Sequence, residues 1–153
     1  MKLKFFSSLV LMTMLFLAAC SPPAGTAEPA NPPASSHGGA VEDQVSLLDA
    51  LRAAGAEVEI GEAVEQPFFS VKGQILKVNG ADVQVFEYES AEAMEADAGQ
   101  VAPDGGSIGT SMVSWVQAPH FFKAGRVLVL YVGEDAAVLG LLEGALGEQF
   151  AGR

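Results

Sequence analysis

Cysteine, histidine and basic residues are scarce in this chain, and each scarcity excludes a class of site or partner. The single cysteine, Cys20, rules out an internal disulfide and any Cys-rich zinc site, and only two histidines, His37 and His120, are present. The 153 residues hold 8 Lys and Arg against 19 Asp and Glu, which gives a formal charge of −11. Because nucleic-acid binding needs clustered cations, we expect no nucleic acid as partner. Because Cys and His are so few, we predict no metal site, and we predict no cofactor.

The chain also lacks an apolar run long enough to stay in a membrane as a helix. Its most apolar stretch extends from Phe5 to Leu17 and is well below the roughly 20 residues that span a bilayer. Lys2 and Lys4 precede this stretch, and small residues follow it. This pattern is typical of a secretory signal, so we expect residues 1–19 to be a signal peptide.

The end of this segment, Leu17-Ala18-Ala19-Cys20, resembles the lipobox of bacterial lipoproteins at all four positions. In that family the cysteine receives a diacylglycerol through a thioether bond, and cleavage leaves it as the new N-terminus. The resemblance implies that residues 1–19 are removed and that acylated Cys20 holds the protein on a lipid bilayer. The alternative is an ordinary cleaved signal followed by an unpaired cysteine.

The residue after the cysteine bears on the destination within the cell envelope. In lipoproteins of double-membrane bacteria, an aspartate at this position is the usual signal for retention at the inner membrane, and this chain has Ser21. The resemblance therefore implies the outer membrane in a host that has one, and otherwise the outer face of the cell membrane.

Residues 20–41 are predicted to form the lipidated start and a disordered tether. Between Ser21 and Val41 the chain has five prolines, three glycines and no aromatic residue, so this segment cannot bury enough surface to order itself. His37 lies in it and is interpreted as a solvated linker residue. Residues 42–153 then form a single globular domain, since their length suits one compact core.

Residues 42–153 alternate between helical and strand patterns. Helical spacing with acidic or capping residues in the first turn predicts three helices, which begin near Glu42, at Ser90 and at Glu134. Seven strands are predicted at residues 57–60, 68–71, 74–78, 82–88, 112–117, 121–123 and 126–132. The order α-β-β-β-β-α-β-β-β-α, with tight turns such as Asn79-Gly80, predicts the α+β class: an antiparallel β-sheet with packed helices in a two-layer sandwich.

The strand predicted at 127–132 is apolar without alternation. Such a strand usually lies centrally in a sheet with both of its faces covered. If the helices cover one face only, the other face must meet a loop, a ligand or a second subunit.

One motif of a catalytic type occurs, since residues 105–109 match the G-x-S-x-G pattern literally. A nucleophile elbow needs a strand before the serine, a helix after it and a large parallel sheet beneath it. Here a helix and a turn come first, and no acid lies between Ser107 and His120 to complete the order of a triad. We therefore interpret the motif as a flexible loop and name no catalytic residue.

The remaining candidate site is an aromatic and basic segment in an otherwise acidic domain. It holds the only tryptophan, the only histidine of the domain and a close basic pair, so we expect any ligand- or partner-binding site around Trp115, His120, Phe122, Lys123 and Arg126. Core packing is the simpler interpretation of its aromatic residues. Because neighbouring residues on a strand point to opposite faces, either Phe121 or Phe122 is expected to be structural.

The sequence thus predicts a lipid-anchored envelope module without enzymatic activity, which binds a protein or a small ligand. The alternative is a structural or assembly factor that docks on another envelope protein through a sheet edge or its aromatic hairpins. An enzyme of unidentified class is the third hypothesis. A deep pocket around His120 would favour a small ligand, whereas an exposed flat aromatic patch would favour a protein partner.

Overall fold

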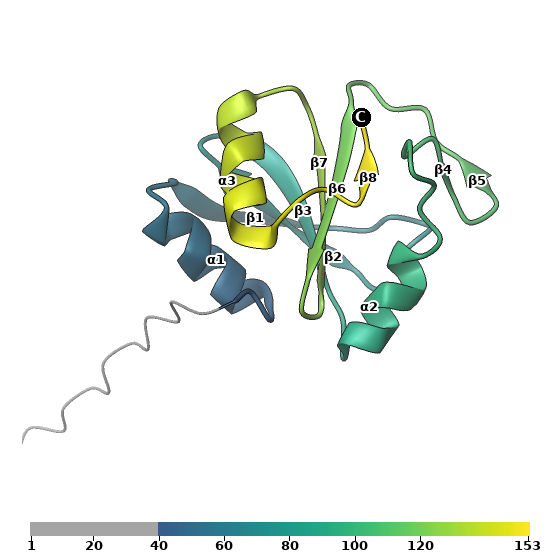
Figure 1. Cartoon of the computed structure of the whole chain (residues 1–153), viewed down its shortest axis with the longest axis horizontal. Coiled ribbons are helices and arrows are strands. Elements are labelled where there is room, and N and C mark those ends of the chain that lie inside the picture. The colour runs from purple at the N-terminus through teal and green to yellow at the C-terminus, as the bar shows by residue number, and fades with distance from the viewer. Residues whose placement is uncertain (1–39) are drawn as a thin grey trace, which may run out of the picture. The chain divides into compact units, whose positions relative to one another are not determined.

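A six-stranded antiparallel sheet organises residues 40–153, the part of the chain that this computed structural model describes (Figure 1). Its strands, in spatial order, are β1 (Val58–Val64), β2 (Gly73–Val78), β3 (Ala81–Glu87), β7 (Val127–Val132), β6 (Pro119–Ala124) and β8 (Ala151–Gly152). Two short strands pair separately, β4 (Ser107–Ile108) and β5 (Ser111–Met112). The helices are α1 (Gln44–Ala53), α2 (Ala91–Ala98) and α3 (Ala136–Leu146). The predicted α+β class with an antiparallel sheet and packed helices is confirmed.

Each helix begins at a side chain that accepts hydrogen bonds from its first turn. Asp43 caps α1, Ser90 caps α2 as the sequence predicts, and Asp135 caps α3. The cap of α1 is reciprocal, because the Ser46 N–H donates to the Asp43 carboxylate and the Asp43 N–H donates to the Ser46 hydroxyl. Hydrogen bonds that the Ser46 N–H and the Ser46 hydroxyl donate to the Asp43 carboxylate, with Arg126 as a smaller cause, hold the pKa of Asp43 below its usual value.

The chain enters the domain beside the turn between β6 and β7. The Arg126 N–H donates to the Glu42 carbonyl at 2.9 Å, and Val41 is buried against the core. Gly125 has φ +53°, and a Cβ there would overlap the backbone of Glu42. Val41, which the sequence assigns to the tether, therefore belongs to the folded domain.

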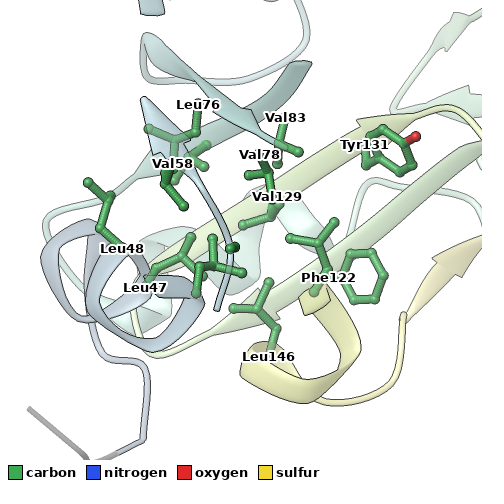
Figure 2. Packing of buried hydrophobic residues seen from close by; sticks show 14 of the residues in the cluster. Leu47, Leu48, Val58, Leu76, Val78, Val83, Phe122, Val129, Tyr131 and Leu146 are labelled. Carbon is green, nitrogen blue, oxygen red and sulfur yellow. The ribbon is translucent and has the colours of Figure 1, made fainter. Parts of the chain in front are cut away.

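Helices and loops cover both faces of the sheet, which places β7 in the middle of the structure. On one face, α1 and α3 pack on Val127, Val129 and Tyr131 of β7 (Figure 2). On the other face, α2 and the loops beside it pack on Leu128 and Leu130. Figure 1 shows α1 and α3 on one side of the sheet and α2 on the other. The expected two-layer arrangement therefore describes the α1 and α3 side, and α2 adds a further layer.

Two predicted strands have other structures. Residues 68–71 form a turn rather than a strand, because Asp97 accepts hydrogen bonds from both the N–H and the hydroxyl of Ser70 and because Phe69 is buried against Phe86. Strand β2 pairs with β3 and with β1, and β1 continues to Val64 rather than ending at residue 60 as predicted. Of residues 112–117, Met112 alone lies in a strand, and the rest cross irregularly from β5 to β6.

Candidate ligand-binding cavity

An open cavity of about 700 Å³ lies where three segments of the chain meet at the start of β6. The loop before β6, the turn between β7 and α3, and the residue after β8 each contribute to its wall. Backbone hydrogen bonds hold these segments together: the Gly133 N–H donates to the Ala118 carbonyl at 3.0 Å, and the Arg153 N–H donates to the Pro119 carbonyl at 3.1 Å. This volume lies in the range of about 300–1,000 Å³ that is typical of small-molecule sites.

His120 contributes to this wall and is 6% exposed. Its Nδ1 lies 2.6 Å from the Gln149 Oε1, and its Nε2 is buried and has no hydrogen-bond partner within the described structure. An amide oxygen only accepts, so Nδ1 is the donor in this contact. The cavity wall thus includes a histidine whose Nε2 is enclosed by protein and has no hydrogen-bond partner among residues 40–153.

The neighbours of His120 fix the position of its ring. The ring stacks on that of Tyr131, with centroids 6.1 Å apart and an interplanar angle of 24°. The Tyr131 hydroxyl in turn accepts the Asp135 N–H at 3.3 Å. Gly133 leaves room for this arrangement, because a Cβ there would overlap the Tyr131 hydroxyl as it is placed. The imidazole is thus held by residues from β7, from the turn after it and from the segment that follows α3.

Trp115 forms another part of the wall and is half-buried. Its indole N–H donates to the Gly105 carbonyl at 2.7 Å, and its ring contacts Phe121 edge-to-face at 5.9 Å. Gly105 has φ +69°, and a Cβ there would approach Pro119 to 2.9 Å. The loop that carries the G-x-S-x-G motif therefore holds the tryptophan in place.

Two charged residues that the sequence analysis does not single out also line the cavity. Glu134 precedes the cap of α3, Arg153 follows β8, and both side chains are exposed. Neither takes part in an ion pair among residues 40–153, whereas Lys72, Lys77 and Lys123 each contact a carboxylate. Arg153 reaches the cavity because Gly152 pairs with His120 across β8 and β6, and the local sequence holds no signal for that pairing.

The structure divides the five predicted binding residues among three places. Trp115 and His120 meet at the cavity. Phe122 is fully buried in the core beneath α1 and α3 (Figure 2), so it is not available to a ligand at the surface. Lys123 and Arg126 lie at the other end of β6, near its turn with β7.

The two basic residues of the predicted site are engaged by acids of the domain. Lys123 pairs with Glu95 and lies 5.0 Å from the centre of the Phe150 ring. Arg126 pairs with Glu87 and lies 3.5 Å from the Asp43 carboxylate. These contacts link α2 to β6, and the start of α1 to β3 and β7, so both cations have a structural role.

Two arrangements of catalytic type are not found among residues 40–153. Within residues 40–153, no group of three His, Cys, Asp or Glu side chains is placed to hold a metal ion. Nδ1 of His120 faces the neutral amide of Gln149 rather than a carboxylate, and no hydroxyl among the described residues bonds to this imidazole. A triad of the hydrolase type requires both of these contacts. Ser107 lies in β4, opposite Met112.

No protein-family model matches this chain, and neither the curated proteins nor the solved structures contain a chain that is significantly similar to it. A functional conclusion therefore has to come from the residues of the site.

Proposed function

We propose that this protein is a lipid-anchored envelope protein whose domain binds a small ligand, without catalysis, in the cavity beside His120. The cavity, with Trp115 and His120 in its wall, is the observation that carries this proposal. The buried Nε2 of His120 supports it, because this atom has no hydrogen-bond partner among residues 40–153. Buried polar atoms in proteins nearly always have a hydrogen-bond partner, and each exception calls for an explanation such as a functional role.

The placement of the aromatic residues supports a small ligand over a protein partner. Phe68 and Phe69 contact each other, Phe69 contacts Phe86, and Trp115 contacts both Phe68 and Phe121. These rings pack on one another at the sheet face that α2 covers, so they do not form a flat exposed patch. The aromatic residues thus lack the flat exposed patch expected for a docking site, and the domain has a cavity at His120, as expected for a small ligand.

The described domain begins at some distance from the cavity. The resemblance to the lipobox places the lipid on Cys20, which lies outside the described residues. The described domain begins beside the β6–β7 turn, whereas the cavity lies at the start of β6. At about 3.3 Å per residue, this strand of six residues separates the two places by roughly 20 Å. Among residues 40–153, none of the helices has the length and apolarity of a membrane span.

A second candidate function, docking on another envelope protein, has one specific observation in its favour. Met112 and Val116 on the segment between β4 and β6 are 92% and 94% exposed. Large apolar side chains at such exposure are available to a partner surface. Substituting both by serine would abolish capture of such a partner and leave small-ligand binding unchanged.

The proposed function is tested by a screen of small-molecule fragments against the mature protein, monitored by NMR. Ligands of the domain should shift the ring signals of His120 and change the fluorescence of Trp115, the chain's only tryptophan. His120→Gln should weaken their binding, and Lys72→Gln, a surface change away from the cavity, should not. Shifts confined to other faces of the domain would refute the assignment of the site.

A further inference from the structure

We infer that the ligand of this cavity is a zwitterion with an apolar side chain, an amino acid or a short peptide. This inference rests on the proposed function, since it names the class of ligand for the same cavity. It follows from the charges that converge at the cavity and from the acidity of the domain around it.

Arg153 supplies the site for the carboxylate of the ligand. Residues 40–153 hold 6 Lys and Arg against 18 Asp and Glu. Four of these six cations contact carboxylates, and Arg52 donates to the Val58 carbonyl at 3.3 Å. Arg153 is thus the one cation whose side chain makes neither an ion pair nor a hydrogen bond within residues 40–153, and it lines the cavity. A guanidinium group binds a carboxylate through two parallel hydrogen bonds.

Glu134 supplies the site for the ammonium group. Its carboxylate is the acid of the cavity wall and takes part in no ion pair among residues 40–153. A carboxylate accepts hydrogen bonds, and an ammonium group carries three donors and no acceptor. A ligand with an ammonium group can therefore pair with Glu134 while its carboxylate pairs with Arg153.

The combined charges discriminate against ligands of a single sign. A simple anion would contact Arg153, but Glu134 and the acidic domain would repel it. A simple cation would contact Glu134 and would leave Arg153 without a partner. A zwitterion carries no net charge, so it avoids the long-range repulsion and satisfies both groups.

The wall also has an apolar part, and the cavity provides room for one or two residues. Trp115, Val113, Pro119 and Leu139 line the cavity beside the charged groups. An aliphatic or aromatic side chain of the ligand would contact this surface, while its charged groups face Arg153 and Glu134. The volume of about 700 Å³ suits a free amino acid or a dipeptide.

Four related probes test the inference by calorimetry and Trp115 fluorescence on the mature protein in detergent. L-phenylalanine and glycyl-L-phenylalanine are zwitterions, N-acetyl-L-phenylalanine is an anion, and L-phenylalanine amide is a cation. We expect a zwitterion to bind at least tenfold more tightly than the anion or the cation. The relative affinity of the first two probes distinguishes an amino acid from a peptide.

Two variants assign the charges, and a third serves as a matched control. Arg153→Gln should weaken binding of the zwitterions at least tenfold and leave the binding of phenylalanine amide unchanged. Glu134→Gln should weaken binding of the zwitterions and of the amide, but not that of the acetylated probe. Lys72→Gln makes the same charge change as Arg153→Gln at a distant exposed site and should have no effect. All three residues are exposed, so the variants are expected to fold.

Three results would overturn the inference. The first is equal affinity for the zwitterions and the acetylated anion. The second is an Arg153→Gln variant that weakens binding of the amide and of the zwitterions to the same extent. The third is failure of all four probes to bind. The proposed function fails separately, if the fragment screen finds no ligand at His120 and Trp115.

Discussion

Replacement of Asp97 by alanine tests the main buried polar network of the domain. Asp97 is the one carboxylate among residues 40–153 that is buried, with 6% exposure. Its Oδ2 accepts from the Ser70 N–H at 2.7 Å, the Ser70 hydroxyl at 2.8 Å and the Tyr88 hydroxyl at 3.0 Å. Its Oδ1 accepts from the Gln100 side chain at 3.1 Å. The carboxylate therefore ties the turn at residues 67–71 and strand β3 to α2.

The cost of removing this group follows from the number of donors it satisfies. A hydrogen bond to a charged group contributes about 1.5–3 kcal/mol, and a buried donor left without a partner costs about 1–3 kcal/mol. The four bonds share one carboxylate, so their contributions do not add. We expect Asp97→Ala to lower the free energy of unfolding by about 3–5 kcal/mol. Asp97→Asn keeps one oxygen for Ser70 and Tyr88, and its expected cost is about 1–2 kcal/mol.

Urea denaturation followed by circular dichroism and Trp115 fluorescence measures both variants. Glu92→Ala, an exposed change in the first turn of the same helix, is the control and should cost less than about 1 kcal/mol. A loss below about 1 kcal/mol for Asp97→Ala, or equal losses for Asp97→Ala and Asp97→Asn, would refute the claim that its hydrogen bonds stabilise the fold.

Three further predictions concern the anchor, the domain and its response to alkali. Cys20→Ser should abolish incorporation of labelled fatty acid and leave either a released domain or an uncleaved precursor, and unchanged labelling would contradict the lipobox assignment. A fragment of residues 40–153 should melt cooperatively at the same midpoint with and without a chelator, whereas a collapse with chelator would reveal a missed metal site. Burial, with the Asp97 carboxylate, raises the pKa of Tyr88 far above its usual value. The unfolded state therefore ionises first, and stability should fall by about 1.4 kcal/mol per pH unit above about pH 10, a loss that Tyr88→Phe should reduce in pH-dependent denaturation.

The elements that the sequence predicts correctly are specified by residues close together in the chain. The caps of all three helices depend on hydrogen bonds within about three residues, and the Asn79-Gly80 turn depends on two residues with positive φ. The failed strand at residues 68–71 has good strand propensity, but Asp97 holds Ser70 from 27 residues away. A contact between residues so far apart in the sequence overrides local strand propensity, and no local sequence pattern indicates it.

The candidate site also combines residues that the sequence predicts with residues that only the fold brings to the cavity. Trp115 and His120 are predictable because each is the only residue of its type in the domain, and their proximity in sequence survives in the fold. Arg153 and Glu134 join them only through the pairing of β8 with β6 and through the turn after β7. The prediction that Phe122 belongs to the binding site is wrong, because strand alternation suggests one exposed face. In the structure both faces of β6 are covered.

This coverage of both sheet faces also decides which surfaces are left for recognition. The edge strand β1 carries exposed Glu59 and Glu62, and its register with β2 shifts between Ile60 and Ala63. Charged side chains and irregular pairing both hinder the addition of another strand. The opposite edge, β8, is two residues long and leads directly to Arg153 at the cavity. Docking through a sheet edge is therefore disfavoured at both ends of the sheet.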